Sequence, residues 1–327
     1  MITAPKMIAL ALCLAPTWGP AATPRITPLE ARAYVRVSSH EELLGFLQKL
    51  AADSPRLVIE TIGTTVQGRP IPMVHVLPQG AGARLRVLVF CQQHGNEPSG
   101  KEAALHLLSR IAGGQEETLG ALDLYLVPSV NPDGNEAAKR QNAHGADLNR
   151  DHLLLSQPET RVLHDLFQRV QPEVTLDVHE YGPFGKAWTS TGWVRAMDEQ
   201  YGAPTNLNVP PQLLSFAKER LFPHLKAELG KQGLRFFEYV LADSPEDTAR
   251  RSTTSINDGR QSFAIQGSLS FILEGRNGRL FNDDLKRRTA SASGVTGSRY
   301  GSGNSGAPSL ASRSSSSSQP MISRLSW

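Results

Sequence analysis

Residues 85–114 read LRVLVFCQQHGNEPSGKEAALHLLSRIAGG, and this stretch decides the expected fold. Its first part, Leu85 to Cys91, is a nearly continuous apolar run, which is typical of a strand buried on both faces of a parallel sheet. Pro98 then opens a helical apolar pattern, which Gly113 and Gly114 end. The stretch therefore predicts a strand, a polar turn and a helix, the repeating unit of parallel α/β sheets.

The same alternation continues on both sides of this unit. Apolar runs predict further strands at 57–62, 71–77, 122–127, 174–179 and 269–274, and helical periods predict helices at 40–52, 158–170 and 211–229. The first of these helices begins with a capping box made by Ser39 and Glu42. We therefore expect one α/β domain whose central sheet is mixed but mainly parallel, with helices on both faces.

Three long segments connect the expected elements, at 128–152, 180–210 and 241–267. They exceed what a simple connection needs, so we expect them to form walls of a binding site.

Composition and charge favour one folded domain. The chain has 327 residues, enough for one α/β domain with a large core, and 34 Lys and Arg against 31 Asp and Glu give a formal charge of only +3. This balance indicates neither a nucleic-acid partner nor a membrane surface.

The two ends differ from the middle. Residues 1–23 have the pattern of a secretory signal peptide, with Lys6, a short apolar stretch and small residues, so we expect an exported protein, periplasmic or secreted, without a stable membrane anchor. Residues 289–327 are rich in Ser, Gly and Arg and are expected to be disordered. The catalytic domain is then 24–288. Removal of the signal leaves Cys91 as its one cysteine, so no intramolecular disulfide is expected.

Candidate metal ligands follow two of the expected strands. His94 and Glu97 lie between a buried strand and a helix, and His179 ends the strand at 174–179. The carboxyl ends of parallel strands meet at one edge of a sheet, where ligands bind. Two histidines and one glutamate, with one position left for water, suit a catalytic zinc site, although each residue alone fits an ordinary cap or strand end.

Further polar residues are expected at the same edge. Glu274 ends the strand at 269–274 and is a candidate general base, with a solvated strand end as the simpler alternative. The segment from Asn131 to Asp151 is rich in turn-forming residues and carries arginines, which suit binding of a carboxylate or a developing oxyanion; solvated loop charges are the alternative.

The combination resembles the carboxypeptidase A-like zinc metallopeptidases. The resembling motifs span residues 40–288 in the family's order: His94-x-x-Glu97, Asn131-Pro132-Asp133-Gly134, Arg140-Gln141-Asn142, Asp147-Leu148-Asn149-Arg150, Asp177-Val178-His179 and Leu273-Glu274. Each motif is weak alone, but their combination and order are specific to this family.

The resemblance implies a role for each matching residue. His94, Glu97 and His179 look like the ligands of one Zn²⁺ ion, and Glu274 looks like the general base that activates the metal-bound water. Arg140 looks like the oxyanion stabiliser, and Asn149 with Arg150 like the clamp on a substrate carboxylate. Asp147 is similar to a carboxylate that orients a zinc-binding imidazole. The implied activity is hydrolysis of the C-terminal peptide bond.

The sequence also departs from the family. Digestive carboxypeptidases carry a tyrosine shortly before the catalytic glutamate, but residues 250–266 contain none, and Tyr239 is set aside as too distant. The final helix expected after Glu274 begins near Phe281 and dissolves into the tail. Glu180 is left out of the site, because neighbouring strand residues point to opposite faces.

Three alternatives to peptide hydrolysis stay open. The same residues suit an amidohydrolase acting on N-acyl amino acids, as in the desuccinylase and aspartoacylase branch, or an enzyme acting on cell-wall peptides. A non-enzymatic carboxylate-binding protein is the third. Every alternative has a partner with a free carboxylate, and a serine hydrolase is disfavoured because no Gly-x-Ser-x-Gly turn precedes a helix.

Overall fold

The computed structural model describes residues 23–277, except 81–83, 193, 245 and 247, together with 285, 286, 288 and 289. The proposed signal peptide, apart from residue 23, and the proposed tail, apart from residue 289, lie outside the described residues. So does most of the expected final helix.

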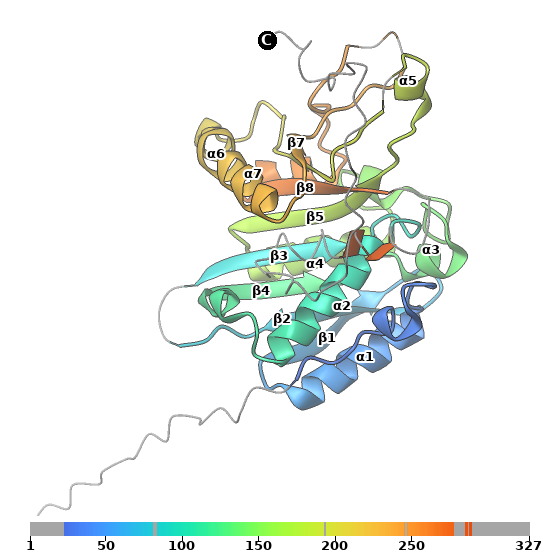
Figure 1. Cartoon of the computed structure of the whole chain (residues 1–327), viewed down its shortest axis with the longest axis vertical. Coiled ribbons are helices and arrows are strands. Elements are labelled where there is room, and N and C mark those ends of the chain that lie inside the picture. The colour runs from blue at the N-terminus through green and yellow to red at the C-terminus, as the bar shows by residue number, and fades with distance from the viewer. Residues whose placement is uncertain are drawn as a thin grey trace, which may run out of the picture.

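The described chain folds as one α/β unit around an eight-stranded sheet (Figure 1). The strands are β1 (Leu57–Thr64), β2 (Pro70–Val76), β3 (Leu85–Cys91), β4 (Leu122–Val127), β5 (Val174–Tyr181), β6 (Glu199–Gly202), β7 (Phe236–Glu238) and β8 (Leu269–Arg276). Their order across the sheet is β1-β2-β4-β3-β5-β8-β6-β7. Pairs β4/β3, β3/β5, β5/β8 and β6/β7 are parallel, and the other three are antiparallel. The expected mixed, mainly parallel sheet is confirmed.

Helices cover both faces of the sheet. The α-helices are α1 (His40–Asp53), α2 (Ser99–Ala112), α3 (Pro132–Ala137), α4 (Pro158–Val170), α5 (Lys186–Thr189), α6 (Pro211–Phe216), α7 (Phe222–Lys231) and α8 (Gly259–Ile265). Short turns of other helix types are η1 (Glu30–Arg32), η2 (Glu117–Ala121), η3 (Leu148–Arg150) and η4 (Ala217–Leu221), the last joining α6 to α7 as a π-helical turn.

Two apolar clusters hold these layers together. On one face, α1, α2 and α7 pack on the sheet through residues such as Leu47, Leu108 and Phe222. On the other face, α4 and α8 pack through Phe167 and Phe263, whose rings stack with centroids 4.5 Å apart. Because the central strands are buried between the two clusters, they read as continuous apolar runs.

The α1 N-terminus shows how local sequence fixes an element. The Ser39 side chain accepts from the Glu42 backbone N–H, and the Glu42 carboxylate accepts from the Ser39 backbone N–H, so the predicted capping box is formed. Helix α1 then buries Leu43, Phe46 and Leu50 along one stripe.

The long connections contain elements that the sequence did not predict. The segment at 128–152 holds α3 and η3, the segment at 180–210 holds α5 and β6, and the segment at 241–267 holds α8. All three enter the edge of the sheet at which β3, β5 and β8 end, and they form the site described next.

Candidate active site

A sharp turn after β3 places His94 and Glu97. Gln92 has a positive φ of 59°, and its amide donates to the Gly95 carbonyl at 3.1 Å, which holds the turn closed. A Cβ on Gly95 would overlap the backbone of Gly134, so glycine is needed where this turn meets the start of α3. The Asn131-to-Gly134 motif therefore supports the His94 motif through direct backbone packing.

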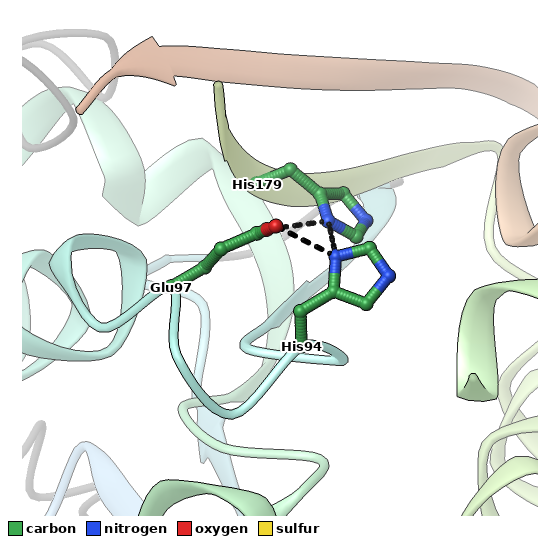
Figure 2. A group of neighbouring side chains, drawn as sticks. All are labelled: His94, Glu97 and His179. Carbon is green, nitrogen blue, oxygen red and sulfur yellow. Dashed lines mark hydrogen bonds and ion pairs between the residues drawn. The ribbon is translucent and has the colours of Figure 1, made fainter. Parts of the chain in front are cut away.

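Three donor groups converge on one point at this edge. The His94 Nδ1 atom lies 2.9 Å from Glu97 Oε1, and the His179 Nδ1 atom lies 2.9 Å from Glu97 Oε2 (Figure 2). The two Nδ1 atoms are 3.0 Å apart. His94 and His179 are 3% and 2% exposed, so the cluster is buried, and its ligand atoms all lie within 4.8 Å of one another.

Acidic side chains hold the outer nitrogens of both imidazoles. His94 Nε2 lies 3.1 Å from Asp147 Oδ1, and His179 Nε2 lies 2.8 Å from Asp177 Oδ1. Asn149 Nδ2 also approaches His179 Nε2, at 3.2 Å, but we assign the ring proton to the nearer, charged Asp177. With its outer nitrogen held by an acid, each ring turns its Nδ1 to the centre of the cluster, the arrangement that orients metal-binding histidines.

Asp177 was not singled out by the sequence analysis, although it belonged to a quoted motif. It lies two residues before His179 on β5, so both side chains share one face of the strand. Its second oxygen accepts from Gln93 Nε2 at 2.8 Å, and Gln93 Oε1 lies 2.8 Å from His152 Nε2. Burial lowers the pKa of His152 to about 3, so this imidazole is neutral in a fully buried polar chain.

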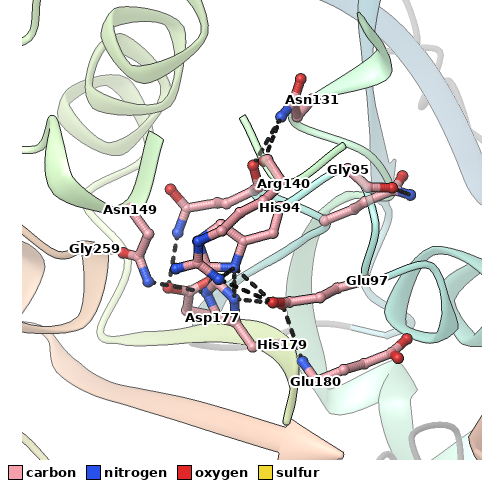
Figure 3. Close-up of polar contacts among 12 residues, drawn as sticks. His94, Gly95, Glu97, Asn131, Arg140, Asn149, Asp177, His179, Glu180 and Gly259 are labelled. Carbon is pink, nitrogen blue, oxygen red and sulfur yellow. Dashed lines mark hydrogen bonds and ion pairs between the residues drawn. The ribbon is translucent and has the colours of Figure 1, made fainter. Parts of the chain in front are cut away.

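Arg140 lies beside His94 and Glu97 (Figure 3), and it also contacts the Asp147 carboxylate. Its Nε donates to Asp147 Oδ2 at 3.0 Å, and its Nη1 lies 3.1 Å from His94 Nδ1 and 3.3 Å from Glu97 Oε1. Although burial opposes it, hydrogen bonding to His94 and the charge of Arg140 hold the pKa of Asp147 well below its usual range. The guanidinium thus lies beside the proposed ligands and remains over a third exposed.

Glu274 faces the cluster from the neighbouring strand. It pairs in register with His179 across β5 and β8, and it lines the same pocket as His94 and Glu97. Burial, with the negative charge of Glu97, raises the pKa of Glu274 to about 7, against the opposing effect of His179. A carboxyl group with such a pKa can both accept and release a proton near neutral pH.

The pocket in front of these residues has a volume of about 530 Å³, within the range of small-ligand sites. Asn149 and Arg150 line it, and the Asn149 side-chain oxygen accepts from the Gly259 backbone N–H at 2.9 Å. Arg150 donates to the Asn149 carbonyl at 2.6 Å. All eight residues singled out in the sequence thus line this pocket or contact a residue that does.

Two more pocket residues were not predicted. Tyr239, which the sequence analysis set aside as too distant, lines the pocket, and its pKa is raised to a value far above 10 by burial and by the charge of Glu274. Arg195 also lines the pocket, with its guanidinium 4.5 Å from the centre of the Tyr181 ring. Both lie in loops whose folding no local pattern reveals.

Glu180 takes part in the site indirectly. Its backbone N–H donates to Glu97 Oε2 at 3.1 Å, whereas its carboxylate turns to the backbone N–H of Ser99 and to Arg288. The side chain therefore supports the start of α2 and does not join the donor cluster.

The donor set fits a zinc ion. Two imidazole nitrogens and one carboxylate, from the turn after β3 and from β5, point at one centre beside the pocket, and two His and one Glu leave a fourth position for water in catalytic zinc sites. Among the described residues, this is the cluster of three or more such donors that converges closely enough to hold a metal.

Comparison with known proteins agrees with this geometry. A zinc carboxypeptidase family model matches residues 43–185, which include all three donors. Carboxypeptidase 2 of Trichophyton rubrum is 26% identical over 264 residues, covering 77% of this chain and 49% of the relative. The chain thus spans about half the length of the curated relatives it matches.

Solved structures show the same fold. A metallo-carboxypeptidase from Burkholderia cenocepacia aligns with a TM-score of 0.62 at 18% identity, covering 80% of this chain and 68% of that one. A metallo-carboxypeptidase from Pseudomonas aeruginosa, in complex with (2-guanidinoethylmercapto)succinic acid, aligns with a TM-score of 0.61 at 23% identity and the same coverage. Residues 43–185 of the chain thus match the zinc carboxypeptidase family, and the relatives and the fold agree with that match.

Proposed function

We propose that this protein is a zinc-dependent metallocarboxypeptidase that removes the C-terminal residue of a peptide. We also propose that residues 24–288 form the catalytic domain, that residues 1–23 direct export to the periplasm or outside, and that 289–327 are a disordered tail. Within the described part of the chain, no helix has the length and apolar character to cross a bilayer.

One observation carries the proposal. A carboxyl group with a pKa raised to about 7, that of Glu274, shares a pocket with the His94 and Glu97 donors and with Arg140 and Arg150. A metal site, a base and cationic groups for a carbonyl oxygen and a terminal carboxylate are the parts that an exopeptidase requires.

Each group has a distinct task in this proposal. His94, Glu97 and His179 would hold a zinc ion, which would supply polarisation of the scissile carbonyl and lower the pKa of a water molecule. Glu274 takes a proton from that water and returns it to the departing amine, since its raised pKa suits both directions. The Arg140 guanidinium donates to the carbonyl oxygen as negative charge grows there. Arg150 binds the terminal carboxylate and so selects the last residue of the chain.

The first test measures metal and substrate together. The purified protein is analysed for zinc by elemental analysis and assayed on blocked dipeptides, N-acyl amino acids and cell-wall peptides, with and without a chelator. We expect about one zinc per chain, release of C-terminal residues from blocked dipeptides, and loss of activity with the chelator. If only the N-acyl amino acids are hydrolysed, the proposed peptidase function is wrong and the protein is an amidohydrolase.

The second test separates the base from the metal. Glu274→Gln keeps the size of the side chain but cannot accept a proton, so we expect hydrolysis to fall by about 10²-fold or more while zinc remains bound. Glu116→Gln is a matched control, because Glu116 is a buried acid paired with Arg110 outside the pocket. Full activity of the folded Glu274→Gln protein would refute the proposed mechanism.

A further inference from the structure

A buried guanidinium lies in the pocket wall beyond Glu274. Arg260, in the first turn of α8, is 2% exposed and lines the same pocket. Its charged end lies 5.5 Å from the centre of the Tyr239 ring, which lines the pocket too. None of the roles proposed above uses this arginine.

The Arg260 guanidinium is short of hydrogen-bond acceptors. Its Nη2 donates to the Ser252 hydroxyl, but its Nε and Nη1 are buried and have no hydrogen-bond partner among the described residues. Arginine carries five N–H donors and stays charged, so unsatisfied donors of this kind are costly in a protein interior. Buried donors of this kind are normally satisfied in natural proteins by a protein group, a bound water or a ligand.

The nearest acid does not satisfy this arginine. Asp258 Oδ2 lies 3.6 Å from Arg260 Nη2, which balances charge but is too long for a hydrogen bond. Its other oxygen, Oδ1, accepts at 2.8 Å from the backbone N–H of Gln261 and so caps α8. Asp258 thus caps α8 through Oδ1, and it leaves Arg260 Nε and Nη1 without a hydrogen-bond partner in the described part of the chain.

The surrounding chain makes room for the guanidinium. A Cβ on Gly202, at the end of β6, would overlap Arg260 Nη1, so glycine is needed for the arginine to lie there. The wall around it is mostly polar, with Ser252, Thr253 and Ser255 lining the pocket. An apolar substrate side chain would bury these groups without replacing their hydrogen bonds.

We propose that Arg260 makes this a specificity pocket for a C-terminal residue with an acidic side chain, glutamate or aspartate. The inference rests on the proposed peptidase function and adds its substrate class. A side-chain carboxylate entering the pocket supplies acceptors to the guanidinium and the Ser252 hydroxyl and pairs with its charge. A lysine or arginine side chain would instead be repelled by the Arg260 charge. Asp258, the nearby acid, already balances that charge and caps α8.

The test compares blocked dipeptides that differ only in the last residue: glutamate, glutamine, leucine and lysine. We expect kcat/KM for glutamate to exceed that for glutamine by roughly 10- to 100-fold, the range for a hydrogen bond to a charged group. Arg260→Gln should remove this ratio, and Arg260→Lys should restore part of it. Arg56→Gln is the matched control, because Arg56 is also a buried arginine but lies outside the pocket, and it should leave the ratio unchanged.

The outcomes separate this inference from the proposed function. Activity with a preference for leucine, lysine or glutamine overturns the acidic pocket and leaves the peptidase standing. An equal loss on every substrate in folded Arg260→Gln also overturns it, because Arg260 would then only support the wall. Absence of hydrolysis on all substrates overturns the peptidase.

A binding measurement decides the specificity without turnover. Zinc-loaded Glu274→Gln protein is titrated by calorimetry with the glutamate- and glutamine-terminated dipeptides. We expect tighter binding of the glutamate peptide, by roughly the same 10- to 100-fold, and equal binding once Arg260→Gln is added. Equal binding by the protein that retains Arg260 would refute the inference.

Discussion

Glu274 gives the metal-free protein a pH-dependent instability that Glu274→Gln should remove. Burial raises the pKa of Glu274 from 4.5 to about 7. Between these two pH values the folded protein holds a proton on this carboxyl that the unfolded chain has already lost. Stability therefore falls as pH rises through this window, and above it the full loss remains.

The size of the effect follows from the two pKa values. One pKa unit corresponds to about 1.4 kcal/mol, so the shift from 4.5 to about 7 costs about 3 kcal/mol once both states are ionised. Part of this cost is already present at pH 5, which leaves about 2.5 kcal/mol to develop between pH 5 and pH 8. Glutamine has no proton to lose, so the variant should gain about that much relative to the parent protein over this range.

Chemical denaturation of the chelator-treated proteins measures this difference. Urea midpoints and slopes are recorded at pH 5 and pH 8 for the parent protein, Glu274→Gln and Glu228→Gln, whose side chain is exposed and outside the pocket. The difference in unfolding free energy between two variants is compared at the two pH values, so that the pH response of every group unaffected by the substitution cancels. The reasoning is refuted if the parent protein and Glu274→Gln keep the same stability difference at both pH values, or if Glu228→Gln shows the same gain.

Three further outcomes follow from the site. Asp177→Asn should weaken zinc binding by about 10- to 100-fold in a chelator-competition titration, whereas Asp133→Asn, at a buried acid paired with Arg69, should not. Arg140→Gln should lower kcat by about 10²- to 10³-fold with a smaller change in KM, measured by steady-state kinetics. Zinc at about 1,000 times its dissociation constant should stabilise the folded protein by about 4 kcal/mol, seen as a higher unfolding temperature than in chelator.

The sheet could be predicted from the sequence wherever strands are buried on both faces. Strands β3 and β4 and helix α4 have the predicted bounds, because continuous apolar runs and a strong helical period mark them. Strands β6 and β7 were missed, since Glu199 to Gly202 is a short, largely polar segment and Phe236 to Glu238 is only three residues long. Strand β6 pairs with β8 and β7 pairs with β6, and no local pattern encodes these pairings.

The residues of the site also fall into two groups, those that the sequence could place and those that it could not. His94 could be placed because it follows an apolar strand, and His179 and Glu274 because each ends an apolar run, so the topology of a parallel sheet brings them to one edge. Tyr239, Arg195 and Arg260 belong to long connections, and their positions depend on loop packing over that edge. Asp177 is an intermediate case, because its spacing from His179 was visible but only the structure shows that the two groups touch.

The charge distribution explains why the cluster favours a divalent cation. Glu97, Asp147 and Asp177 surround two imidazoles, and Arg140 balances one of these three negative charges. Without metal, the pKa of His179 is raised well above 6.5, because Asp177 and Glu97 outweigh the effect of burial, and a proton then supplies part of the missing charge. Zinc must displace that proton, so its affinity should increase with pH while His179 is still protonated in the free protein. The same acids that orient the ligands thus make the metal-free state costly, and a doubly charged ion relieves both the repulsion and the need for the proton.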